Sequence, residues 1–217
     1  MKMPEKTMIE IRHKTTGQVL KQVEADSLAG QFLEGAKLAG ADLSGRDLTS
    51  IDLQRADLRD ADFTGCKLDG ALLSGALLKG ATFCDASMTK VDLTDAFAHG
   101  AGFSQAVLTG ANMRYAKLAE CDFSKANLNG ADLSMAELAC DFTEANPTKA
   151  DLRGSNLNGA IFDRAMMLGA NLTDAKMAGA DMVGARVEGA IMGAGRRAGP
   201  QIFRKKEVSR PWWQFWG

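Results

Sequence analysis

A period of five residues runs through most of this sequence and leaves few folds open to it. It is plain in residues 41–45, Ala-Asp-Leu-Ser-Gly, and again in residues 126–130, Ala-Asn-Leu-Asn-Gly. With the large apolar residue as the centre of each unit, centres recur every five residues from Leu38 to Leu138 and from Phe142 to Met192, which makes 32 units. A fixed internal period of this kind is the signature of a repeat architecture.

Side-chain alternation within each unit predicts a short strand followed by a corner. Of the 32 centres, 29 are Leu, Phe or Met, and 25 of the residues two places before a centre are Ala. Both positions point inward in an extended chain, and the residue between them points outward. Gly follows two places after the centre in 15 of 31 units, where a corner calls for positive φ. A helix is excluded because a period of five would smear the apolar residues around its whole surface.

The spacing of the phenylalanines predicts the number of units in each turn. Six of the phenylalanines follow one another at intervals of 20 residues, with a single interval of 19. If a coil has four units, all six lie in one of four columns, which six independent residues would do by chance about once in a thousand trials. Four units therefore make one coil. We expect an all-β solenoid of about eight four-sided coils, packed inside and without a ligand tunnel. The set is Phe63, Phe83, Phe103, Phe123, Phe142 and Phe162.

Three local departures from the repeat lie within this predicted solenoid. Between Leu138 and Cys140 only Ala139 remains, where other units have two corner residues. Because the phenylalanine column resumes afterwards, we expect a tightened corner with the coil register intact, and no domain boundary. Arg46 stands at an inward position and Pro147 at a centre.

Residues 26–192 resemble the pentapeptide repeat family, whose unit is a small residue, then Asp or Asn, then Leu or Phe, then two small or polar residues. The resemblance implies a right-handed quadrilateral β-helix. It also implies a kind of partner, since family members of known activity include DNA-mimicking proteins that bind type II topoisomerases such as gyrase. Those members commonly dimerise through their C-terminal ends.

Both ends of the chain depart from the repeat, and we expect three parts. Residues 1–25 contain two strand-like stretches, 8–12 and 18–23, around a Gly-containing turn, which predicts a β-hairpin that caps the exposed edge of the first coil. Residues 26–192 form the solenoid. Residues 193–217 form a basic tail that holds all three tryptophans of the chain.

Three interpretations of the tail stay open. It could fold back over the last coil, dock a partner or a second copy as in a homodimer, or lie on an anionic membrane surface, where basic and aromatic residues bind well. Its candidate binding residues are Arg210, Trp212, Trp213, Phe215 and Trp216.

Catalytic chemistry finds no support in the sequence. An enzyme needs titratable groups that converge on a cleft, and a rod with apolar inward positions offers none, so we expect no catalytic residue, no cofactor and no metal. His13 and His99 have no partner at ligand spacing. The four cysteines form no Cys-x-x-Cys pair, and we interpret Cys121 and Cys140 as buried neighbours that replace Ala. With no apolar segment long enough to span a bilayer, we expect a cytoplasmic protein.

Charge separates along the chain. Residues 26–192 carry 23 acidic and 15 basic side chains, whereas residues 193–217 carry one acidic and six basic. Outward aspartates form two ladders that could imitate the phosphates of DNA, but Thr82 and Gly102 interrupt one ladder, and Leu72 and Asn112 the other. We therefore favour solvated acidic faces over DNA mimicry, and we expect no direct binding of nucleic acid. The ladders are Asp42, Asp62, Asp122, Asp141 and Asp181, and Asp52, Asp92, Asp132 and Asp151.

An apolar patch is the other surface feature. Leu77 and Phe97 occupy outward positions of one column in successive coils, and Leu72 lies around the corner. Exposed apolar patches often mark association sites. The sequence thus favours a non-enzymatic scaffold that binds another protein, or itself, through the tail and this patch. A gyrase-binding DNA mimic and a membrane-associated protein are the alternatives.

Overall fold

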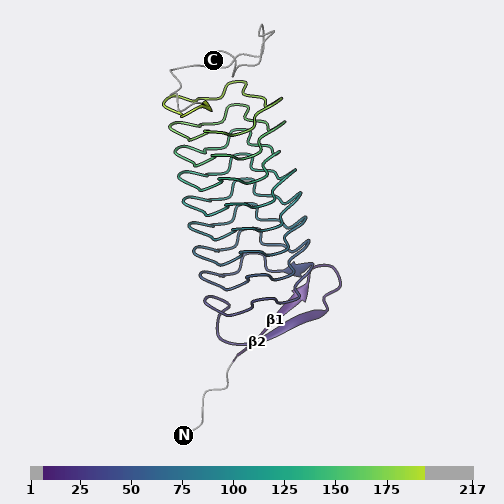
Figure 1. Cartoon of the computed structure of the whole chain (residues 1–217). Helices are drawn as coiled ribbons and strands as arrows, with labels where there is room; N and C mark the ends of the chain where they lie inside the picture. Colours follow the sequence, from purple (N-terminus) through teal and green to yellow (C-terminus); the bar gives the residue numbers. More distant parts are fainter. Residues whose placement is uncertain (1–6, 194–217) are drawn as a thin grey trace.

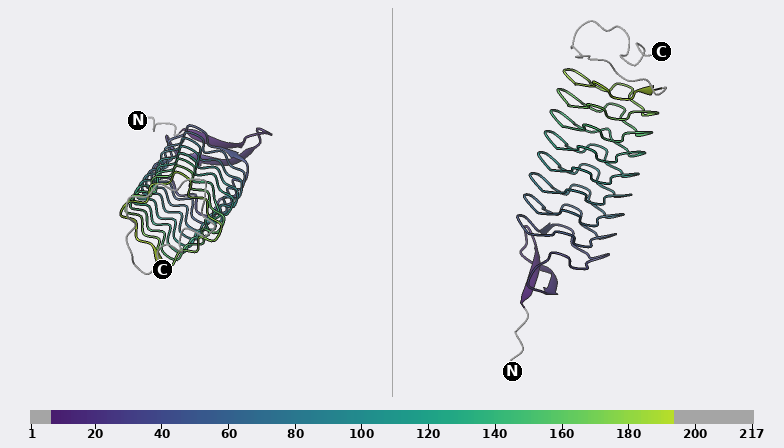
Figure 2. Two further views of the ribbon diagram at one scale, coloured as in Figure 1. Left: turned by 90° about the horizontal axis from the view of Figure 1, so that it is seen from above. Right: turned by 90° about the vertical axis from the view of Figure 1, so that its left-hand side faces the viewer.

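The computed structural model describes residues 7–193, which form a rod of stacked four-sided coils (Figure 1). Viewed from above, the coils lie over one another with a common outline (Figure 2). Outward residues form parallel bridges with residues 20 positions later, as Asp42 does with Asp62 and Leu77 with Phe97, or 19 positions later where the bridge spans the short corner, as Asp122 does with Asp141. Four five-residue units therefore make one coil, as the phenylalanine spacing predicted.

Three sets of backbone hydrogen bonds join each coil to the next, and one of them links the corners, where the Gly40 N–H group donates to the carbonyl oxygen of Arg59 at 2.7 Å. The N–H group of a centre donates to the carbonyl oxygen of an outward residue one coil further on, as Leu38 does to Asp57 at 2.7 Å. The N–H group of Asp57 in turn donates back to the carbonyl oxygen of Ala36 at 2.9 Å. The strands are so short that each contributes a single bridge on each side, and the stack of coils takes the place of long paired strands.

The N-terminal hairpin consists of β1 (Met8–His13) and β2 (Val19–Glu24), which pair antiparallel. Strand β1 also pairs antiparallel with β3 (Ala41–Asp42), so the sheet order is β2-β1-β3 and the hairpin covers one edge of the first coils (Figure 1). This contact explains the charged residue at inward position 46, because the Arg46 guanidinium donates to the backbone carbonyl oxygen of Glu10 at 3.3 Å.

The core of the rod is a continuous apolar interior. The six phenylalanines are fully buried, and their rings stack with centroids 4.7 to 5.1 Å apart and planes within 8° of parallel. This spacing matches the separation of paired strands, so each ring lies directly over the one before it. Offset or stacked aromatic pairs add about 0.5–1.5 kcal/mol beyond the area they bury.

The short corner keeps the register of the stack, as the sequence predicted. The Cys140 N–H group donates to the carbonyl oxygen of Leu138 at 2.8 Å, which closes the corner with one residue fewer than elsewhere. On the far side Asp122 bridges Asp141, and the ring of Phe142 stacks on Phe123 at 5.1 Å.

Pro147 is buried at a centre, where it lacks the N–H group that other centres donate to the next coil. The neighbouring hydroxyl partly compensates for the missing donor. Thr148 Oγ1 lies 3.2 Å from the backbone carbonyl oxygen of Met166 in the next coil and 2.6 Å from Asn146 Oδ1, so its one hydroxyl proton is shared between these two acceptors. The side chain of Thr148 thus supplies part of the inter-coil contact that a backbone N–H group makes elsewhere.

The corners require positive φ two places after the centre, whatever residue stands there. Gly45 has a φ of 65°, and Ser50 and Lys90 adopt nearly the same conformation at 55° and 57°. The outward Asp or Asn of the unit stabilises this turn, because its Oδ1 accepts the N–H of the residue two places on. In this way Asp62 Oδ1 accepts from Thr64 N at 2.9 Å.

Candidate interaction surface

The interior of the rod leaves no space for a substrate between residues 7 and 193. Inward side chains fill it from the hairpin to the last described coil, and nearly all of them are less than 5% exposed. A shallow hollow of about 190 Å³ lies beneath the hairpin, lined by Ile9, Ser27, Leu28, Arg46 and Asp47. The surface of the described rod that is open to contact therefore consists of its outer faces and edges.

Residues 7–193 contain no group of three or more His, Cys, Asp or Glu side chains placed to hold a metal ion. In the same range no helix has the length and apolar character needed to cross a membrane.

The cysteines are free thiols, and burial controls their chemistry. Cys66, Cys121 and Cys140 are buried inside the rod, and each donates its Sγ–H to a backbone carbonyl oxygen at 2.6 to 2.9 Å. Burial raises the pKa of Cys66 to about 11. The pKa of Cys140 is raised as well, first by burial and then by the adjacent Cys121 thiol, the neighbour that the sequence predicted. Raised pKa values keep Cys66 and Cys140 protonated and unreactive.

The phenylalanine face, which we define as the outward side of the strands carrying the phenylalanine column, bears one aspartate ladder. Its carboxylates are used in their own corners: Asp42 accepts from Ser44, which lowers the pKa of Asp42, and Asp141 accepts from Thr143. Within the described chain none of its five aspartates forms a salt bridge. Thr82, Gly102 and the partly exposed Ile161 interrupt the ladder.

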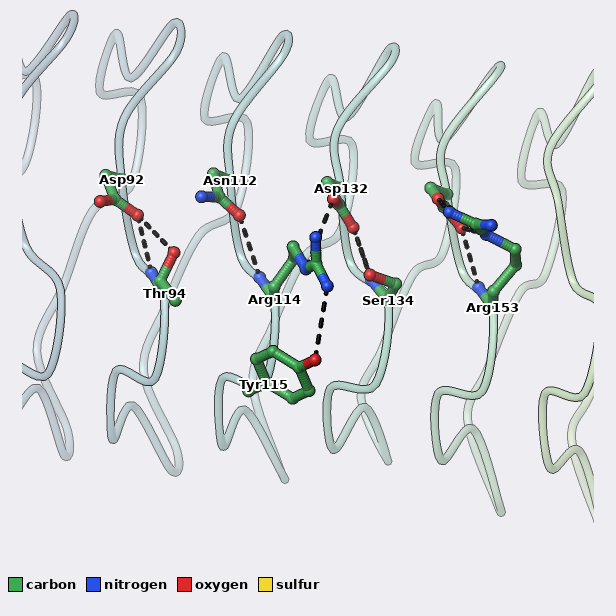
Figure 3. A network of polar contacts seen from close by, with 9 residues as sticks. Asp92, Thr94, Asn112, Arg114, Tyr115, Asp132, Ser134 and Arg153 are labelled. Atoms are coloured by element: carbon green, nitrogen blue, oxygen red, sulfur yellow. Dashed lines mark hydrogen bonds and ion pairs between the residues drawn. The ribbon is translucent and has the colours of Figure 1, made fainter.

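We define the Leu72 face by its outward residues, which include Asp52, Leu72 and Asp151. This face carries the second aspartate ladder, and basic side chains neutralise part of that ladder (Figure 3). The Arg114 guanidinium lies 3.8 Å from the carboxylate of Asp132. Arg153 forms a salt bridge of 2.5 Å with Asp151 and lowers the pKa of Asp151. This face is therefore a mixed polar surface and lacks a continuous negative charge.

The three apolar residues indicated by the sequence lie on two faces that meet at one edge. Leu77 and Phe97 are bridged neighbours on what we call the Phe97 face, and are 38% and 45% exposed. Leu72 is 37% exposed on the adjoining Leu72 face. The Lys117 ammonium lies 5.1 Å from the centre of the Phe97 ring, a cation–π arrangement.

Two more apolar side chains stand at the edge between these faces, which we call the Tyr115 edge. Tyr115 is 46% exposed and Met135 55% exposed, at matching corner positions of successive coils. The Tyr115 ring lies beside the Arg114 guanidinium, 5.3 Å from it (Figure 3). We define the apolar stripe as Leu72, Leu77, Phe97, Tyr115 and Met135. It spans four successive coils.

Sequence reasoning missed Tyr115 and Met135 because it considered only the outward strand positions. Both lie at the corner position with positive φ, 59° and 62°, which places them at an edge. The signal was available, since this position otherwise holds Gly or a polar residue in nearly every unit. Among the other exposed apolar residues, Phe32 lies on the Leu72 face two coils before Leu72, Met8 lies in β1, and Val107, Ile161 and Met166 lie on the two remaining faces.

The candidate binding residues of the tail fall outside the described part of the chain. They are Arg210, Trp212, Trp213, Phe215 and Trp216.

A model of one protein family matches the repeated units of this chain. The family model for pentapeptide repeats matches in eight copies, over residues 36–75, 66–105, 106–138, 139–167 and 164–193. No curated protein matches the chain. The chain is similar to the solved structure of a trypsin-treated form of QnrB1, described as a plasmid-mediated fluoroquinolone resistance protein. The identity is 22%, over 70% of this chain and 87% of that one, with a TM-score of 0.42.

It is also similar to HetL from the cyanobacterium Nostoc sp. strain PCC 7120, described as a pentapeptide repeat protein involved in the regulation of heterocyst differentiation. The identity is 29%, over 78% of this chain and 92% of HetL, with a TM-score of 0.32. The family model covers well over half of the chain, and its unit is the one that the coils are built from. The chain therefore belongs to the pentapeptide repeat family of quadrilateral β-helices.

Proposed function

We propose that this protein is a non-enzymatic interaction rod that binds another protein along the Tyr115 edge, together with its aromatic tail. The observation that carries the proposal is the apolar stripe, five exposed apolar side chains on four successive coils, beside the basic groups of Arg114 and Lys117. Tyr, Phe, Met and Arg are the residue types enriched in protein interfaces. The filled interior supports a surface role over a catalytic one.

The stripe can be tested with paired variants of the full chain. In Leu77→Ser/Phe97→Ser, two apolar side chains of the stripe become polar, whereas Val107→Ser makes the same kind of change at a 39% exposed position on another face. We expect the double variant to lose protein partners that the original chain and Val107→Ser retain in affinity capture. Equal recovery of the same partners by all three proteins contradicts the proposal.

A DNA-mimicking, gyrase-binding protein is the second candidate. The observation that favours it is the phenylalanine face, whose aspartates are free of salt bridges in the described chain. Electrostatic mimicry predicts gyrase binding that weakens steeply with salt. Asp122→Asn/Asp141→Asn should weaken it further, since Asn removes the charge and keeps the oxygen that accepts the corner hydrogen bond. Absence of gyrase binding at low salt eliminates this candidate.

A further inference from the structure

The apolar stripe and the end of the described chain lie on the same edge of the rod. Ile191 forms a bridge with Asn171 and so extends the Leu72 face by one coil. Gly193 follows Ile191 by two residues, as Thr173 follows Asn171, and therefore lies in the same corner column as Thr173, Arg153 and Arg114. That column is the Tyr115 edge. The chain therefore enters residues 194–217 from the edge that carries the stripe, three coils beyond Met135.

The remaining chain is long enough to reach the whole stripe. Coils repeat at about 4.8 Å, so the coil of Leu72 and Leu77 lies about 30 Å back along the edge from Gly193. Residues 194–210 form a connection of 17 residues, which spans up to about 55 Å when extended. The six residues Pro211 to Trp216 extend over about 20 Å, comparable to the length of the stripe.

The composition of residues 211–216 fits the apolar stripe, and the charge of residues 194–210 is opposite to that of the rod. The segment 211–216 holds three tryptophans and Phe215, and would complement a row of exposed apolar and aromatic side chains. The connection 194–210 carries six basic residues and one acidic residue, whereas residues 26–192 carry an excess of eight acidic side chains, which attracts the connection to the rod as a whole. At the Tyr115 edge itself Asp174 is accompanied by Arg114 and Arg153, so it is the apolar side chains of the stripe that select this edge.

We propose that residues 211–216 dock on the apolar stripe of their own molecule, so that the tail covers the Tyr115 edge until a protein partner displaces it. The inference rests on the proposed function in taking the stripe as a binding surface. It adds the occupant of that surface in the free protein, and with it a means of control. Once displaced, the tail is free to contact the same partner beside the stripe.

Tryptophan fluorescence of the full chain tests the docking directly, because every tryptophan lies between residues 212 and 216. We expect blue-shifted emission and weak acrylamide quenching in the original protein. Leu77→Ser/Phe97→Ser should red-shift the emission and raise the quenching constant about twofold or more, as expected for indole rings returned to water. Val107→Ser should leave both unchanged. Tyr115→Ser/Met135→Ser provides a second stripe variant, and circular dichroism confirms that each protein is folded.

Three results would overturn the inference. Emission of the original chain equal to that of a free peptide of residues 211–217 would show that the tail is undocked. Emission that is blue-shifted but insensitive to both stripe variants would place the tail elsewhere, such as over the last coil. A shift that appears only as protein concentration rises would assign the contact to a second copy.

These outcomes are separate from failure of the proposed function. Fluorescence reports the tail in the isolated protein, whereas affinity capture reports the partner. Loss of partner capture by the stripe variants with unchanged fluorescence supports the proposed function and overturns the docking. Changed fluorescence with unchanged partner capture does the reverse.

Discussion

At the scale of single residues, the phenylalanine column and the exposed Phe97 show how position decides what an aromatic ring does. Phe103 is fully buried between two stacked rings, at 5.0 and 4.7 Å, whereas Phe97 is 45% exposed. Removing a buried ring loses its transfer free energy and leaves a cavity between neighbours that cannot close around it.

We therefore expect Phe103→Ala to lower the free energy of unfolding by about 3–5 kcal/mol, and Phe97→Ala by about 1 kcal/mol or less. Urea denaturation followed by circular dichroism measures both. Similar losses for the two variants would mean that the column contributes no special stability.

The buried thiols give the rod a pH dependence on the alkaline side. Burial raises the pKa of Cys66 from its ordinary value near 9 to about 11, so the folded state holds its proton where the unfolded state releases it. The stabilisation is fully present below pH 9 and is lost as the pH rises toward 11. Cys66→Ala, which installs the residue that most units have there, should make the stability less sensitive to pH in this range. Denaturation midpoints at pH 8 and 10.5 test this, and identical pH dependence in both proteins would contradict it.

At the scale of elements, Pro147 and Thr148 show how one unit tolerates a residue that breaks the ladder. Thr148 Oγ1 shares its proton between Asn146 Oδ1 in its own corner and Met166 O in the next coil, whereas Thr143 Oγ1 donates to Asp141 Oδ1 in its own corner. We expect Thr148→Val to cost about 1 kcal/mol more than Thr143→Val. In a Pro147→Leu background, which restores the backbone donor, that difference should shrink. A difference unaffected by Pro147→Leu would refute the compensation.

Much of this element structure could be predicted from the sequence, for a physical reason. Alternation and the 20-residue spacing are imposed by backbone geometry, which every coil repeats, so 32 units give the same signal many times over. Tyr115 and Met135 were not predicted because side-chain alternation assigns an inward or outward direction only to strand residues, and these two residues lie at corners. The function of the outward aspartates in closing their own corners was also missed, since a solvated face explains the same residue type.

At the scale of the whole molecule, the fold separates stability from recognition. Inward positions hold the rod together, and each coil contacts only its neighbours, so surface residues can vary without disturbing the core. The hairpin of β1 and β2 covers one end, and the described chain ends at the other on the Tyr115 edge (Figure 1). Recognition therefore depends on which faces and edges carry unusual residues, information that the repeat itself does not contain.

Site-specific photocrosslinking measures directly whether partners bind along the Tyr115 edge. A photoreactive side chain is placed at position 77 or 117 on the Phe97 face, at 107 on another face, or at 122 on the phenylalanine face. We predict crosslinks to the same partner from positions 77 and 117, and none from 107 or 122. Crosslinks mainly from position 122 would contradict the account and assign recognition to the acidic face.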